Sequence, residues 1–204
     1  YPFNSGQIDI ETGGTLTANA STVTLTGDSD PSAAVLLVNG GTLNVDSSLF
    51  VFNTDAEANL VFGNVLFYDL QITPTITDDR LYYLGTDTTD SFVQVANNMT
   101  INPTSTGSNT LTVKLGAEGY FDGNSVIDAS GSASLTFDTN SVSSYVFSAS
   151  GTWDINSGAT FLGNGSDLTF AGTLTLSGGT FSAPNASQIS ASSNLTISSG
   201  SFTS

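Results

Sequence analysis

The chain has 204 residues, a formal net charge of −16 at pH 7 and only two basic residues, Arg80 and Lys114. Two cations cannot neutralise a phosphate backbone, which argues against a nucleic-acid partner, and the negative charge opposes docking on anionic lipid. Because the chain contains no His and no Cys, histidine acid–base catalysis, thiol nucleophiles and zinc or iron–sulfur sites are excluded.

The composition favours strands over helices. Hydrophobic residues make up 38% of the chain and charged residues 10%, so there is enough apolar material for a core. Lys and Glu, which are common on helix surfaces, are nearly absent, whereas Val, Thr, Phe and Tyr fit pleated surfaces. No segment has the apolar length of a membrane span, and no signal peptide opens the chain, which begins at Tyr1. We expect an all-β protein without membrane insertion, and we interpret the missing Met as a sign of processing or excision.

The first repeat lies near the N-terminus. The segments GGTLTANASTVTLTGD, from Gly13, and GGTLNVDSSLFVFNTD, from Gly40, match without gaps. Each alternates apolar residues with Thr, Asn or Asp, as strands with one buried face do, and Gly-Gly pairs mark the turns. The alignment sets Phe50 and Phe52 against apolar residues, so we expect both rings to point into the core.

The segment Thr77–Phe92 (TDDRLYYLGTDTTDSF) departs from this pattern. It contains Arg80, the pair Tyr82 and Tyr83, and four Asp residues. Because Tyr and Arg are favoured contact residues, one interpretation is a protruding loop that contacts a glycan or a neighbouring subunit. The alternative is an insertion whose tyrosines cover the side of the molecule.

Three repeats follow in the C-terminal part, GTWDINSGATF from Gly151, GTLTLSGGTF from Gly172 and SNLTISSGSF from Ser193, at intervals of 21 residues. Their apolar positions align in three sets: Trp153 with Leu174 and Leu195, Ile155 with Leu176 and Ile197, and Phe161 with Phe181 and Phe202. We expect the members of each set to stack directly on one another.

Two architectures contain many short strands. In an antiparallel β-sandwich, neighbouring strands need not resemble each other. In a β-solenoid each repeat lies on the previous one, so aligned positions select similar residues. The aligned apolar positions favour a parallel β-helix of roughly eight rungs, with residues 1–204 forming a single domain that carries an irregular insertion near 77–92. The β-sandwich is the alternative.

The units GTLTLSGGTF and NLTISSGSF resemble the imperfect repeats of secreted β-solenoid proteins on bacterial and archaeal cell surfaces. Those proteins include autotransporter passengers and filamentous-haemagglutinin-like adhesins. The resemblance covers Gly13–Asp55 and Gly131–Ser204. It implies an extracellular stalk, adhesin or assembly role, and it brings no catalytic residues with it.

Acidic turns are the candidate metal ligands. Asp122 and Asn124, with Asp128, offer hard oxygen ligands that could bind calcium from one loop, as could Asp28 with Asp30. The alternative is that these Asp and Asn residues form turns. The sequence requires no cofactor.

Five Asn-x-Ser/Thr sequons are candidate glycosylation sites: Asn19, Asn98, Asn164, Asn185 and Asn194.

Enzymatic activity would require a carboxylate pair of the glycoside-hydrolase type. Asp28 and Asp30 could share a face, whereas the adjacent Asp78 and Asp79 would point in opposite directions along a strand. The aromatic and basic residues that grip a sugar chain beside such a pair are missing. We therefore expect no enzyme, with a polysaccharide-degrading β-helix as the alternative.

Ice binding would need runs of Thr that align from one rung to the next, and here the Thr runs are scattered and out of phase.

The favoured function is that of a secreted structural β-solenoid whose subunits associate end to end into a filament, sheath or surface stalk. The final segment begins a new rung with apolar residues at core positions (Leu195, Ile197 and Phe202), which another subunit could cover. The alternative is a cell-surface adhesin that binds a glycan or a partner protein.

Overall fold

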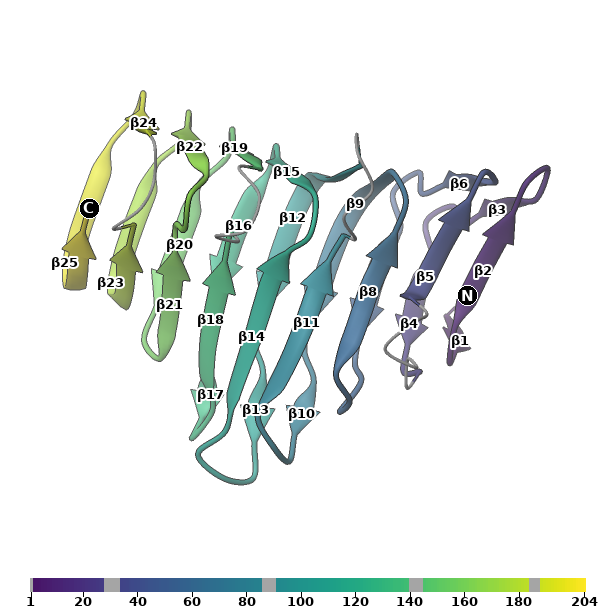
Figure 1. Ribbon diagram of the computed structural model, residues 1–204, viewed down its shortest axis with the longest axis horizontal. Helices are drawn as coiled ribbons and strands as arrows, with labels where there is room; N and C mark the ends of the chain where they lie inside the picture. Colours follow the sequence, from purple (N-terminus) through teal and green to yellow (C-terminus); the bar gives the residue numbers. More distant parts are fainter. Residues whose placement is uncertain (1, 28–33, 86–90, 140–144, 184–187) are drawn as a thin grey trace.

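The computed structural model describes residues 2–27, 34–85, 91–139, 145–183 and 188–204. They form an all-β structure with 65% strand, in which parallel strands stack as a β-solenoid of about seven turns (Figure 1). Twenty strands belong to one continuous sheet that winds around the molecule. Every pairing between named strands in the described residues is parallel, so the β-helix prediction is confirmed and the antiparallel sandwich is not what forms. No helix in the described part of the chain has the length and apolarity to cross a membrane.

Each turn visits three faces in the order A, B, C, and each face is a ladder of paired strands. Face A contains β1 (Phe3–Ser5), β4 (Thr22–Leu25), β7 (Leu49–Phe52), β16 (Asn124–Ile127) and β20 (Trp153–Asn156). Face B, toward the viewer in Figure 1, contains β2 (Ile8–Glu11), β5 (Ala34–Asn39), β8 (Ala58–Phe62), β11 (Arg80–Leu84), β14 (Thr110–Leu115), β18 (Ser134–Asp138) and β21 (Ala159–Leu162). Face C contains β15 (Glu118–Phe121), β19 (Val146–Ala149), β22 (Asp167–Phe170) and β24 (Gln188–Ala191).

Four long strands span a corner between two faces. β9 (Val65–Ile72) and β12 (Phe92–Ile101) run from face C into face A, and β23 (Leu174–Ser182) and β25 (Leu195–Thr203) run from face A into face B. Two small sheets complete the structure: β3 (Thr15–Thr17) with β6 (Thr42–Asn44), and β10 (Thr75–Ile76) with β13 (Thr104–Ser105) and β17 (Ser130–Gly131).

Alternation within the strands builds the core. In β14, for example, the residues are alternately half-buried and fully buried, so one set of side chains faces inward and the other outward. Because equivalent residues of successive turns are paired, the inward side chains form ladders. The predicted ladder is confirmed: Trp153 pairs with Leu174, and Leu174 with Leu195. The rings of Phe50 and Phe52 are fully buried, as expected.

Aromatic rings dominate the core toward the C-terminus. Phe161, Phe181 and Phe202 stack with centroids 5.0 and 4.7 Å apart and planes within 3° of parallel. Trp153 is fully buried and packs edge-on against Phe147 and Phe137, at 5.1 and 5.4 Å. Aromatic pairs at these distances contribute beyond the area that they bury.

A column of glycines allows the turns to approach closely between faces C and A. A Cβ on Gly151 would lie 2.1 Å from the carbonyl oxygen of Gly123, and a Cβ on Gly172 would lie 2.1 Å from that of Gly151. Only Gly permits this contact, which explains why two of the C-terminal repeats begin with Gly.

The expected insertion near 77–92 contains a regular strand of the solenoid. β11 (Arg80–Leu84) pairs with β8 on one side and β14 on the other. Tyr82 is fully buried in the core, and Tyr83, the next residue, is half-buried. The interpretation of a loop that protrudes with both tyrosines is therefore wrong for this strand; residues 86–90 lie outside the described part. The periodicity was hidden because the intervals are unequal: Tyr82 pairs with Ala58, 24 positions earlier, and with Val113, 31 positions later.

Candidate functional site

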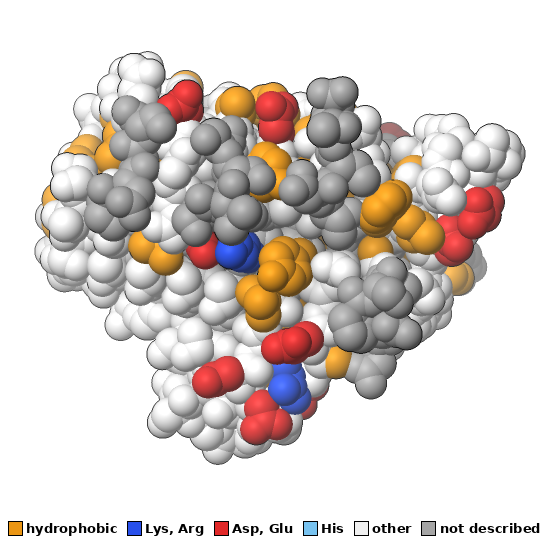
Figure 2. Space-filling view, in the orientation of Figure 1, with side chains coloured by type: hydrophobic (Ala, Val, Ile, Leu, Met, Phe, Trp, Pro, Cys, Tyr) orange, Lys and Arg blue, Asp and Glu red, His pale blue; other side chains and the backbone are white. Residues whose placement is uncertain are grey.

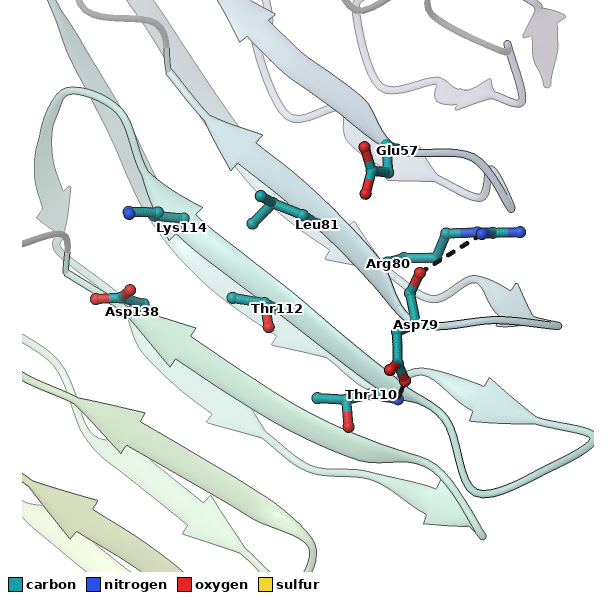
Figure 3. A pocket seen from close by; sticks show the side chains of 8 residues that line it. All are labelled: Glu57, Asp79, Arg80, Leu81, Thr110, Thr112, Lys114 and Asp138. Atoms are coloured by element: carbon teal, nitrogen blue, oxygen red, sulfur yellow. Dashed lines mark hydrogen bonds between the residues drawn. The ribbon is translucent and has the colours of Figure 1, made fainter.

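An open depression of about 400 Å³ lies on the outer surface of face B (Figure 3). It crosses β11, β14 and β18, with Glu57 from the turn before them at its border. Outward side chains of adjacent strands form it, because Leu81 pairs with Thr112 and Lys114 pairs with Asp138. The lining residues are Glu57, Asp79, Arg80, Leu81, Thr110, Thr112, Lys114 and Asp138. We call this depression the lateral groove.

Arg80 is held at one end of the groove by the preceding turn. Its Nε donates to the backbone oxygen of Asp55 at 2.8 Å and to the Asp55 carboxylate at 3.1 Å, and its guanidinium lies 3.6 Å from Asp78. The Asp55 carboxylate also accepts hydrogen bonds from the backbone N–H of Thr77, at 3.0 Å, and from its hydroxyl, at 2.7 Å. Desolvation alone would raise the pKa of Asp55, but the hydrogen bonds from Thr77 and the charge of Arg80 outweigh it and lower this pKa.

Tyr82 anchors the same strand from the inside. Its buried hydroxyl donates to the backbone oxygen of Thr54, and burial raises the pKa of this phenol. Arg80 and Tyr82 therefore both bind β11 to the preceding turn, which holds this end of the groove in place.

The acidic groups of the groove are fixed by neighbouring turns. The Asp79 carboxylate accepts the backbone N–H of Thr110 at 2.8 Å, and the Asp138 carboxylate accepts the side-chain amide of Asn164 at 3.1 Å. Lys114 lies beside Asp138 in the register.

Both cations of the chain lie in this one groove. Figure 2 shows the two basic side chains on the same face, with hydrophobic side chains between them and acidic side chains around them. Three carboxylates line the groove with the two cations, so the local charge does not attract an anion. The arrangement combines charged donors and acceptors, hydroxyls and an apolar floor at Leu81.

The two ends of the coil stack form a second candidate site. At the C-terminal end, Leu195 and Ile197 are 44% and 50% exposed, although they continue the inward ladders of Leu174 and Leu176. At the N-terminal end, Phe3 is 49% exposed. Among the described residues, β1, β2 and β25 pair with a strand on one side only, so the other edge of each is available for pairing.

A hollow of about 250 Å³ opens in the first turn. All of its lining residues belong to that turn, and Phe3, Ile8, Ile10 and Leu16 supply its apolar part. The apolar side chains of the last turn could enter a hollow of this character.

The three candidate calcium ligands do not share one loop. Asp122 precedes β16, Asn124 begins this strand and Asp128 follows it, so about 13 Å of extended chain separates the two ends. The Asp122 carboxylate accepts a hydrogen bond from Gln94, and the carboxylate of Asp128 accepts the backbone N–H of Ala129. The described residues contain no group of three or more acidic side chains placed to hold a metal ion. Calcium binding at Asp122, Asn124 and Asp128 stays a prediction.

The sequons differ in accessibility. Asn19, Asn98 and Asn194 are exposed, although the amide of Asn98 donates to Asp69 at 3.1 Å. Asn164 is half-buried, and its amide is engaged by Asp138 as described above. Asn185 lies outside the described residues, as do the acidic residues Asp28 and Asp30.

Sequence reasoning missed the groove residues Glu57, Lys114 and Asp138. The available signal was the scarcity of cations. With only two basic residues in the chain, a surface that contains both of them is a candidate site. The spacing of Arg80 and Lys114 gives no hint of this, because the turn between them has an unusual length.

No protein-family model matches this chain, and comparison with curated proteins and with solved structures gives no match either.

Proposed function

We propose that this protein is a structural β-solenoid whose copies stack head to tail into an extracellular filament, sheath or surface stalk. The observation that carries the proposal is the uncovered last turn, where Leu195 and Ile197 are half exposed at positions that are core positions in every preceding turn that pairs with them. The extracellular location follows the resemblance of the repeats to secreted surface proteins.

The two ends fit each other in chain direction. On face A the intervals between paired residues are similar at the two ends, 20 positions from Phe3 to Val23 and 21 from Leu174 to Leu195, whereas on face B the first interval, from Ile8 to Leu36, is 28 positions. Because all pairing is parallel, β25 of one copy can pair with β1 on face A and with β2 on face B of the next copy.

Such a contact buries apolar side chains and satisfies strand edges together. Phe202 would extend its aromatic ladder onto Ile8 and Ile10 at the hollow of the next copy. The contact joins two different surfaces, so it repeats and produces an open filament unless the geometry closes.

Net charge opposes this stacking. Two copies of charge −16 repel each other at low ionic strength, and salt screens the repulsion as the Debye length falls from about 30 Å at 0.01 M to about 8 Å at 0.15 M. Association should therefore strengthen over this range of salt, whereas an assembly held by surface ion pairs would weaken.

The test uses light scattering and electron microscopy on residues 1–204. The wild type should form rods that lengthen with concentration and salt. Ile197→Asp should abolish the rods, because it places a charge in the apolar contact, whereas Leu66→Asp should not, although Leu66 is 43% exposed on face C. If the wild type stays entirely monomeric at high protein concentration in salt, the proposal is overturned.

Mixing end variants distinguishes head-to-tail stacking from other association. Phe3→Asp blocks the N-terminal end and Ile197→Asp the C-terminal end, so each variant alone should be monomeric. The mixture should give a one-to-one heterodimer through the two intact ends. Larger species, or no heterodimer, would contradict a head-to-tail contact.

A further inference from the structure

We propose that the lateral groove binds an uncharged saccharide chain. This is a lateral binding function, separate from the stacking of the ends. A filament would present one such groove per copy at a regular spacing along its side.

The shape of the groove fits a linear, hydrated ligand. Its volume of about 400 Å³ falls within the range of about 300–1,000 Å³ that is common for small-ligand sites. It is open to solvent and crosses three strands, so a chain can enter from the side and extend beyond it. A second, smaller depression adjoins it, because both are lined by Glu57 and Leu81, and Tyr83 lines the second one. The apolar surface therefore continues along the face.

The chemistry of the lining fits hydroxyl groups. A carboxylate accepts hydrogen bonds from hydroxyls, and the ammonium of Lys114 donates three. The hydroxyls of Thr110 and Thr112 can do either. In Figure 3 these side chains stand around Leu81, which offers an apolar surface for the C–H face of a sugar ring.

Charge selects against anionic ligands. The Arg80 guanidinium is already paired with Asp55 and Asp78, which leaves Lys114 as the main cation facing three carboxylates. An anionic sugar such as a uronate would meet those carboxylates in a molecule of net charge −16. A cationic amino sugar would be repelled by Lys114 but attracted by the three carboxylates, so the comparison with a cationic probe shows whether hydrogen bonding or charge selects the ligand. An uncharged sugar gains hydrogen bonds with every one of these groups without repulsion.

The groove is also pre-organised. Asp79, Asp138 and Arg80 are each fixed by a hydrogen bond to another turn or to a neighbouring residue. Binding therefore orders few side chains, which limits the entropic loss of association.

The experiment is isothermal titration of the full chain with named hexasaccharides: cellohexaose, xylohexaose, mannohexaose and laminarihexaose as uncharged probes, with hexagalacturonate and a chitosan hexamer as charged ones. Titrations use the Ile197→Asp variant, so that stacking does not compete with binding. At least one uncharged probe should bind more tightly than both charged ones. A failure of all uncharged probes, or a preference for a charged probe, would overturn the proposal.

Matched variants locate the binding. Leu81→Arg should reduce affinity at least tenfold by filling the groove, whereas Val126→Arg should not, since Val126 is an outward, half-buried strand residue on face A. Asp138→Asn should weaken binding severalfold, and Asp154→Asn on face A should leave it unchanged. Equal effects of groove and face A variants would contradict the location. Saccharide binding without stacking would support the groove proposal alone, and stacking without saccharide binding would support the filament proposal alone.

Discussion

The turns before residue 140 and the turns after residue 145 share one core design but differ in their connections. After residue 145, paired residues of successive turns are 20 to 22 positions apart, as for Phe161 with Phe181 and for Leu174 with Leu195. Before residue 140 the interval reaches 31 positions, between Tyr82 and Val113. The inward ladders continue through both parts without a break. The spacing of the core is therefore set by strand pairing and not by the chain length of a turn.

The longer turns carry additional described residues beside the main stack that supply polar chemistry, although Ile76 of β10 is buried in the core. β10, β13 and β17 form a small sheet that extends below the main stack in Figure 1. The connection between β10 and β11 contributes Thr77 and Asp79 to the network around the lateral groove. The short C-terminal turns build no comparable network among their described residues. Variation in turn length is thus the means by which this fold acquires a site.

The first prediction tests whether the two cores are equivalent. Phe52→Asp before residue 140 and Phe161→Asp after residue 145 should each prevent folding, because both rings are fully buried and an unpaired carboxylate would replace them. Val51→Asp and Thr160→Asp, at the adjacent outward positions, should fold. Circular dichroism and thermal melting provide the measurement. A cooperative transition in only one of the two core variants would show that the cores differ.

The second prediction concerns close approach between turns. Gly151→Ala should cost about 1–3 kcal/mol of unfolding free energy or more, because the new Cβ would meet the backbone of the preceding turn. Gly131→Ala, in the small outer sheet, has open space and carries only the strain of its φ of +70°, about 1 kcal/mol. Urea denaturation gives both values. Equal costs would contradict the view that the core stack is tighter than the outer extensions.

The C-terminal turns could be predicted from the sequence because constant turn length keeps equivalent residues at a constant spacing. Trp153, Leu174 and Leu195 were therefore aligned correctly. In the central part, β11 and β14 are regular, paired strands. The long connection between them hides from the sequence that their residues are equivalent. In the described part of the segment near 77–92, β11 is a regular strand of the solenoid, and the irregularity lies in its spacing from β14.

The candidate site could not be predicted for the same reason. Asp55 and Arg80 meet because they occupy neighbouring turns, and no motif records a contact whose spacing depends on the length of one turn. The calcium hypothesis shows the opposite limitation. Asp122 and Asp128 are close in sequence, yet β16 between them is extended and holds them apart. Proximity along the chain predicts proximity in space only where the chain turns.

The smallest expected effect tests whether the polar network of the longer turns stabilises the fold. The pKa of the Asp55 carboxyl is lower in the folded state than its ordinary value, so the native state favours the ionised form. This stabilisation is complete above the unfolded-state pKa of about 4 and disappears as the pH falls through the lower folded value. Because Asp55 is partly exposed, solvent screens the interaction, and about 1 kcal/mol or less of stabilisation is expected.

Acid also reduces the repulsion within this acidic chain, so the free energy of unfolding of the wild type must be compared with that of Asp55→Asn at each pH. The difference should be largest near pH 6 and should shrink steadily below about pH 4. Asp154→Asn, which removes a carboxylate outside the network, is the matched control. A difference between wild type and Asp55→Asn that stays constant from pH 6 to about pH 2 would mean that Asp55 acts through its shape and neutral hydrogen bonds, and not through its charge.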